Sequence, residues 1–205
     1  MKKKNFIWDF DGTIIDTYPH STTACLNVLK KYGIEAEYDE VIGLLRNSFS
    51  SIIPRYNLTH EQFVEVMDHA LILWFEPNPT IYKGIDKVLK TIVERGGKNF
   101  IYTNRDKTSK EYLEHFGLLP YFTDFVCNDT EGYVQKPSGE SIDYLLQKHS
   151  LSKESAVMVG DRELDVLCGE KAGIASILFD EFHKSEDTVA NAVIYDISDV
   201  LNFIE

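Results

Sequence analysis

Apolar and polar positions divide the chain into two parts with different rhythms. From about residue 80 onward, short apolar runs typical of buried strands alternate with stretches whose apolar residues recur at helical spacing. The expected strands lie at 98–103, 124–127, 155–159, 174–179 and 192–195, and the expected helices at 85–95, 107–115, 138–149 and 163–172, with a short helix ending the chain. This alternation predicts an α/β fold of three layers, in which a parallel sheet carries helices on both faces.

Residues 17–78 break this alternation. Their apolar side chains recur at helical spacing, and they show no convincing strand pattern; the positions include Leu26, Leu29, Phe63, Val66, Met67, Ala70, Leu71 and Trp74. Pro77 and Pro79 then mark the return to the alternating part. We therefore predict a helical cap domain at 17–78, inserted into an α/β core formed by 1–16 and 79–205.

Composition narrows the classes of partner. A chain of 205 residues with 43% hydrophobic content can bury a proper core, and its formal net charge of −12 disfavours nucleic acid and acidic membranes. No apolar run reaches the length of a transmembrane helix. Three scattered cysteines and the absence of an export signal predict reduced thiols and a cytoplasmic location. No interface stretch stands out, so we expect a monomer, with a dimer as the alternative.

Two carboxylates follow the first apolar run. Asp9 comes directly after Phe6–Trp8 and Asp11 comes two residues later, so strand alternation would place both side chains on one face. Such a pair is tolerable where a cation or a shared proton relieves the repulsion. Gly12 lets the backbone turn sharply and leaves room for a ligand. Because Asp-Gly is also a common turn pair, this segment alone fits a strand-ending turn equally well.

Three more polar clusters occur where expected strands stop or the next helix opens. They contain Thr103 with Asn104, Lys136, and Asp161 with Asp165. The carboxyl ends of parallel strands meet at one edge of a sheet, so these side chains are expected to converge with the first carboxylate pair. Carboxylates hold hard cations such as Mg²⁺, and lysine with small donors binds phosphate oxygens. The set therefore fits phosphoryl transfer.

Each of these residues also has an ordinary structural explanation. Thr103 could cap the following turn, and Lys136, which precedes a proline, could be an exposed loop residue. Asp161 could be a helix N-cap, and Asp165 could pair with Arg162 or Lys171. Together these explanations require four coincidences at one sheet edge, so we prefer the functional interpretation.

Four motifs in order carry a family resemblance: WDFDGT, IYTNR, QKP and GDRELD. The chain resembles the haloacid dehalogenase-like hydrolase superfamily, in its phosphoglycolate phosphatase and β-phosphoglucomutase-like branch with a small helical cap. The resemblance implies a Rossmann-like core and a Mg²⁺-dependent phosphatase. Its expected partner is a small phosphorylated metabolite, hydrolysed through an aspartyl-phosphate intermediate.

The resemblance also implies a role for each motif residue. Asp9 would be the nucleophile and Asp11 the general acid, with Lys136 neutralising charge on the nucleophile and phosphate. The metal ligands would be Asp9, Asp11 through its backbone carbonyl, Asp161 and Asp165. Asp165 could instead orient Lys136. The phosphate-binding residues would be Thr103, Asn104 and Gly12.

Several alternatives stay open at this point. Asp11 disfavours carbon–halogen cleavage, whereas His20 keeps a phosphosugar mutase in view, although the mutase histidine is expected one residue later, at Ser21. A module that binds phosphometabolites or proteins without turnover is disfavoured by the presence of Asp9. Arg46 fits either a cap residue that binds a second anionic group or a solvated helix end. Arg105, at the end of the second motif, could approach the substrate, but a surface position is favoured.

Overall fold

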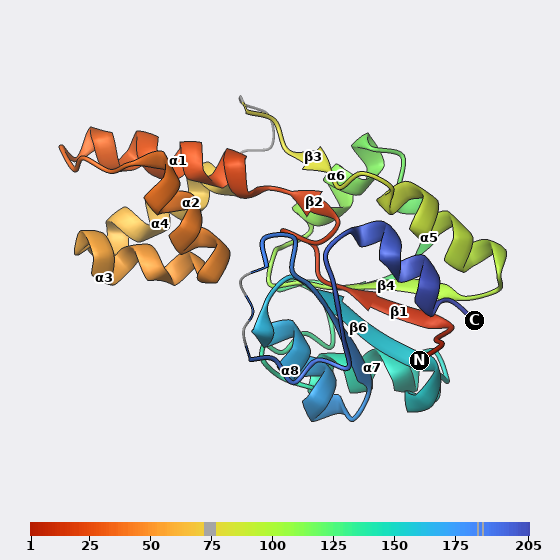
Figure 1. Cartoon of the computed structure of the whole chain (residues 1–205). Helices are drawn as coiled ribbons and strands as arrows, with labels where there is room; N and C mark the ends of the chain where they lie inside the picture. The colour runs from red at the N-terminus through yellow and green to blue at the C-terminus, as the bar shows by residue number, and fades with distance from the viewer. Residues whose placement is uncertain (72–76, 184, 186) are drawn as a thin grey trace. The chain divides into compact units, whose positions relative to one another are not determined.

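The fold is described from a computed structural model, which describes residues 1–71, 77–183, 185 and 187–205. Contacts divide the chain into two compact units, Met1–Ile14 with Ile81–Glu205, and Ile15–Thr80. Figure 1 shows the elements of both units. Trp74, which the sequence places in cap packing, lies outside the described residues.

The larger unit is built on a six-stranded parallel sheet with strand order β5-β4-β1-β6-β7-β8. Its strands are β1 (Asn5–Trp8), β4 (Lys98–Tyr102), β5 (Phe122–Val126), β6 (Ala156–Gly160), β7 (Ala175–Phe179) and β8 (Ala192–Ile194). Its helices are α5 (Ile85–Glu94), α6 (Thr108–His115), α7 (Glu140–Lys148) and α8 (Glu163–Ala172), with 3₁₀ turns η2 (Leu119–Tyr121), η3 (Lys153–Ser155) and η4 (Ile197–Phe203).

Helices cover both faces of this sheet. Figure 1 shows α5 and η4 over one face and α7 and α8 over the other. The core between the sheet and α7 and α8 contains fully buried side chains such as Ile7, Phe100, Ile142 and Met158. The predicted three-layer α/β class with a parallel sheet is confirmed. The chain ends in the 3₁₀ helix η4 rather than in an α-helix.

A buried hydrogen bond between side chains joins β1 to β4. Trp8 is fully buried, and its indole Nε1 donates to Asn99 Oδ1 at 3.0 Å. Asn99 in turn donates to the carbonyl oxygens of Leu89 and Tyr121, both at 3.1 Å. Buried polar groups destabilise a fold unless they are hydrogen-bonded. These bonds therefore favour one position of β1, the strand that precedes Asp9, beside β4.

The smaller unit is helical. It contains β2 (Ile15–Asp16), α1 (Tyr18–Lys31), α2 (Tyr38–Asn47), η1 (Phe49–Ser51), α3 (Ile52–Tyr56) and α4 (His60–Leu71), and β2 pairs with β3 (Thr80–Ile81). Val28, Val41, Leu45 and Val66 are buried in its core, as expected where amphipathic helices pack. Among the described residues, no helix has both the length and the apolar character needed to span a membrane.

Candidate active site

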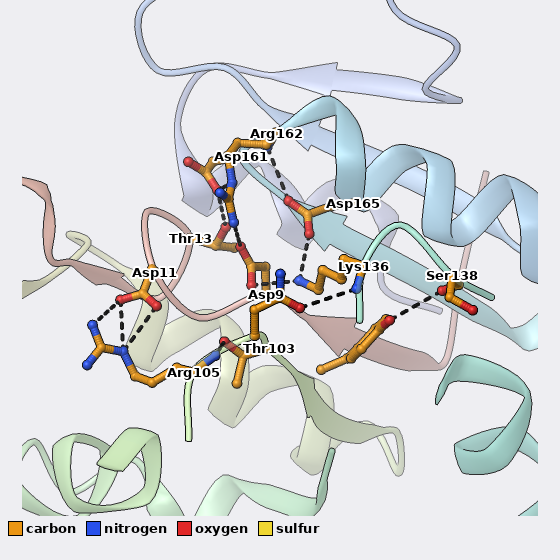
Figure 2. A network of polar contacts seen from close by, with 12 residues as sticks. Asp9, Asp11, Thr13, Thr103, Arg105, Lys136, Ser138, Asp161, Arg162 and Asp165 are labelled. Carbon is orange, nitrogen blue, oxygen red and sulfur yellow. Dashed lines mark hydrogen bonds and ion pairs between the residues drawn. The ribbon is translucent and has the colours of Figure 1, made fainter. Parts of the chain in front are cut away.

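Three neighbouring strands deliver polar residues to one edge of the sheet. Asp9 follows β1, Thr103 follows β4 and Asp161 follows β6, and β1 lies between β4 and β6. The backbone N–H of Asp9 donates to the Val159 carbonyl at 2.8 Å, so the ladder between β1 and β6 continues one residue beyond the strand. This register sets Asp9 beside the loop that carries Asp161 (Figure 2).

A buried lysine joins two carboxylates. Lys136 Nζ lies 2.7 Å from Asp9 Oδ1 and 2.6 Å from Asp165 Oδ1, and its side chain is fully buried. Nζ also lies 5.0 Å from the centre of the Tyr102 ring, whose π-face attracts a cation. Lys136, for which an exposed loop position was the ordinary explanation, is therefore an interior residue of the site.

Asp165 is fixed by the start of α8. Its Oδ2 accepts the backbone N–H of Arg162, the N-cap residue, at 3.2 Å, and its own backbone N–H donates to the Arg162 carbonyl at 3.0 Å. A side chain at Gly160 would overlap the Asp165 carboxyl, so only glycine permits this approach. Both Asp165 oxygens are thus engaged within the protein, and one of them holds Lys136.

Burial and neighbouring charges shift the pKa values of Asp9 and Lys136. Burial, followed by the charge of Asp165, raises the pKa of the Asp9 carboxyl, while Lys136 and Arg162 oppose that rise. Burial alone would lower the pKa of Lys136, but Asp165 and Asp9 outweigh it and the pKa lies above the ordinary value. The two carboxylates therefore favour the protonated form of Lys136, and further positive charge beside Asp9 would favour the ionised form of its carboxyl.

The cluster fits a divalent cation. Ligand atoms of Asp9, Asp161 and Asp165 lie within 4.8 Å of one another. Asp9 Oδ2 is buried, makes no hydrogen bond with any described residue, and has Arg162 Nη2 at 3.7 Å. Three carboxylates here face two cations, Lys136 and Arg162. All-oxygen donors with excess negative charge suit Mg²⁺.

Asp11 lies in a different environment. Arg105 Nε donates to both Asp11 oxygens at 3.1 Å, and Nη2 donates to Oδ1 at 2.8 Å. The strand ends at Trp8, so strand alternation does not extend to this pair of carboxylates. Asp9 pairs with Lys136 and Asp11 pairs with Arg105.

Arg105 corrects one expectation from the sequence. It was expected at the surface, but its side chain is 6% exposed, with the guanidinium 5.8 Å from the Phe10 ring centre and 5.5 Å from that of Tyr112. Burial opposes its charge, but Asp11 outweighs burial and raises the pKa of Arg105. The available signal was its position two residues after Thr103, on the loop that follows β4.

Thr103 and Asn104 begin that loop. Thr103 Oγ1 accepts the backbone N–H of Arg105 at 3.1 Å, which leaves its hydroxyl hydrogen as a donor. Asn104 Oδ1 accepts the backbone N–H of Lys136 and the hydroxyl of Tyr133, both at 3.3 Å. Gly12 takes φ +78°, in the left-handed region that favours glycine.

Two residues named from the sequence belong to the smaller unit. The Arg46 guanidinium lies 5.7 Å from the centre of the Tyr18 ring. His20 is buried, with Nδ1 3.2 Å from the Pro77 carbonyl oxygen. A substrate role for either residue remains a prediction.

Known proteins resemble the chain over most of its length. The sequence profile described as haloacid dehalogenase-like hydrolase matches residues 6–179. The chain is 26% identical to a phosphoglycolate phosphatase of Vibrio cholerae, covering 92% of this chain and 89% of that protein. It is 27% identical to the pyrophosphatase PpaX of Halalkalibacterium halodurans, again covering 92% and 89%.

Solved structures show the same fold. A hydrolase of Streptococcus pneumoniae is 33% identical, with 87% of this chain and 94% of that chain covered and a TM-score of 0.65. A haloacid dehalogenase superfamily hydrolase of subfamily IA from Geobacter sulfurreducens is 20% identical, with coverage of 99% and 97% and a TM-score of 0.72. The second likeness supports the fold alone.

Proposed function

The chain belongs to the haloacid dehalogenase-like hydrolase family, and on that premise we propose that it is a Mg²⁺-dependent phosphatase acting through an aspartyl phosphate on Asp9. The observation that carries the proposal is the buried chain of Asp9, Lys136 and Asp165 at the end of β1. A carboxylate held by one oxygen in the interior, beside donors for phosphate, is suited to attack phosphorus.

In the first half of the reaction, Asp9 attacks phosphorus. Oδ1 is held by Lys136, so Oδ2 is the proposed attacking atom. A bond forms between Oδ2 and phosphorus while the bond from phosphorus to the alcohol oxygen breaks, and Asp11 gives a proton to that oxygen. Asp11 paired with Arg105 is an ionised carboxylate that only accepts hydrogen bonds, so it must leave Arg105 and take up a proton from solvent before it can donate.

In the second half, water attacks phosphorus and the bond to Asp9 breaks. Asp11 takes the proton from water, which returns both carboxylates to their starting state and releases phosphate. The ionised form of Asp11 that Arg105 stabilises is the form this step requires. The proposed donors to the phosphate oxygens are Lys136, Thr103 and Asn104. Gly12, which has no side chain, leaves room for the phosphate beside the loop that follows β1.

The proposed ligands of Mg²⁺ are Asp9, Asp161, Asp165 and the backbone carbonyl of Asp11. Asp165 is the weaker candidate among the side chains, because its two oxygens hold Lys136 Nζ and the backbone N–H of Arg162. Bound Mg²⁺ would supply the positive charge that a phosphate dianion needs in a site where three carboxylates face two cations.

The proposed substrate is a small phosphorylated metabolite. Relatives named as a phosphoglycolate phosphatase and a pyrophosphatase support that class. We propose that Arg46 binds a second anionic group of the substrate. Residues 17–78 are the proposed cap domain. Buried, free Cys25, Cys127 and Cys168 support the proposed cytoplasmic location.

The test measures phosphate release from an aryl phosphate with and without Mg²⁺. Wild type should require Mg²⁺ and lose activity on chelation, and Asp9→Asn should lower kcat on the order of 10⁴-fold or more. Asp143→Asn, the same change at a half-exposed carboxylate paired with Lys153, is the matched control and should retain activity. Turnover in metal-free buffer, or full activity of Asp9→Asn, contradicts the proposal.

A further inference from the structure

The amide of Asn104 has a defined orientation. Its Oδ1 receives the backbone N–H of Lys136 at 3.3 Å and the Tyr133 hydroxyl at 3.3 Å. A backbone N–H can only donate, so the side-chain atom facing it must be the amide oxygen. The Tyr133 hydroxyl meets the same oxygen and therefore acts as a donor there as well.

This orientation leaves the other end of the amide available. Asn104 Nδ2 makes no hydrogen bond with any residue in the described ranges, so its two N–H groups can serve a ligand. Asn104 directly follows Thr103 at the end of β4, and its oxygen is bonded to the backbone of Lys136. A flipped amide would present its oxygen to the site and repel phosphate.

The loop that carries Tyr133 is itself fixed. The Tyr102 hydroxyl donates to the Val134 carbonyl at 2.6 Å, and the backbone N–H of Val134 donates to Ser141 Oγ at 2.8 Å. Gly132 takes φ +80°, and a side chain there would overlap the Tyr144 ring. Tyr133 is half-buried, so its hydroxyl is presented from a constrained backbone rather than from a free surface loop.

We infer that Tyr133 is a positioning residue for the phosphate site. Its hydroxyl holds Asn104 Oδ1 and so directs Nδ2 toward the phosphate oxygens. The inference rests on the proposed function for the identity of the ligand. The orientation of the amide stands on the hydrogen bonds alone.

A double-mutant cycle tests whether Tyr133 acts through Asn104. Tyr133→Phe keeps the ring and removes the hydroxyl, and kcat/KM for an aryl phosphate should fall about five-fold, the factor for one neutral hydrogen bond. In an Asn104→Ala background the same change should alter kcat/KM by less than about two-fold, because its partner is gone. Tyr195→Phe, the same change at a half-exposed tyrosine, is the control and should leave kcat/KM unchanged. An equal loss in both backgrounds, or no loss in wild type, overturns the inference.

A spectroscopic readout separates this inference from the proposed function. The side-chain amide signals of Asn104 in a ¹⁵N-labelled NMR spectrum are identified by their loss in Asn104→Ala. They should shift or broaden in Tyr133→Phe and stay unchanged in Tyr195→Phe. Unchanged signals in Tyr133→Phe refute the positioning role. If wild type releases no phosphate while these signals respond, the proposed function fails and the positioning role stands.

Discussion

Asp9 and Asp11 are the same residue type, two positions apart, yet they lie in different environments. The Asp9 side chain is 2% exposed and is bonded to a fully buried lysine. The Asp11 side chain is 26% exposed and is bonded to Arg105, on the loop that follows β4. The two carboxylates therefore have different partners, and the Asp11 side chain is the more exposed to solvent.

The difference suits two separate tasks. A nucleophile gains from a fixed position, which burial and Lys136 give to Asp9. An acid that later acts as a base must exchange protons with the leaving group and with water, and the greater exposure of Asp11 permits that exchange. Two like groups placed in unlike environments commonly divide the roles in this way.

The largest effect in this comparison is expected for Asp11→Asn. An asparagine cannot exchange the proton, so kcat should fall on the order of 10²- to 10⁴-fold, the usual range for general acid–base catalysis. The loss in kcat/KM, which reports the first half of the reaction alone, should be greater for an alkyl phosphate than for a dinitrophenyl phosphate, whose leaving group needs no proton. Steady-state kinetics with the two substrates checks the prediction, and equal losses in kcat/KM would show that Asp11 is not the acid.

A smaller effect is expected for Arg105→Met, which keeps an unbranched side chain but removes the guanidinium that lies over the Phe10 and Tyr112 rings. Charge-assisted hydrogen bonds contribute about 1.5–3 kcal/mol, so kcat should fall about ten-fold or somewhat more. In an Asp11→Asn background the change should have little further effect, because Arg105 acts on that carboxylate.

Arg105→Lys is the matched control for this test, since it keeps the charge and should recover part of the rate. Kinetics of the single and double variants decides the question. A full ten-fold loss in the Asp11→Asn background would mean that Arg105 acts elsewhere.

The smallest effect concerns Asp124, a carboxylate outside the site whose ion pairs are structural. Burial would raise its pKa, but Lys148 at 2.8 Å and His149 at 2.7 Å outweigh burial and lower it. A lowered carboxyl pKa stabilises the fold above the carboxyl's ordinary pKa, and this contribution is lost as pH falls through the folded value.

Asp124→Asn should therefore cost about 1 kcal/mol of unfolding free energy near neutral pH, and less in acid. Its kcat should equal that of wild type. Thermal unfolding at several pH values measures the first effect. A loss that grows in acid, or a loss of activity, would contradict the structural role.

Much of the fold follows from local sequence pattern. The helix predicted at 85–95 is α5, because Ile85, Val88, Leu89 and Ile92 recur at helical spacing and form its buried face. The two-residue strands β2 and β3 were not predicted, since two residues carry no period. The short helix predicted near the end of the chain is the 3₁₀ helix η4, a helix type that apolar spacing does not specify.

The positions of site residues that directly follow parallel strands could be predicted from the sequence. Asp9 and Asp161 follow neighbouring strands, so topology alone brings them to one edge. Arg105 was not predictable as the partner of Asp11, because a long side chain's direction depends on rings that pack beside it. The hydroxyl of Tyr133 reaches Asn104 across a loop, and such contacts leave no periodic signal.

One measurement tests the central claim most directly: acid quenching of a single turnover, followed by mass spectrometry of the peptide that contains Asp9. If Asp9 is the nucleophile, that peptide carries one phosphoryl group on Asp9, and the group is absent in Asp9→Asn and accumulates in Asp11→Asn supplied with a dinitrophenyl phosphate. A turnover in which Asp9 stays unmodified throughout, or in which the phosphoryl group is found on another residue, would contradict the account.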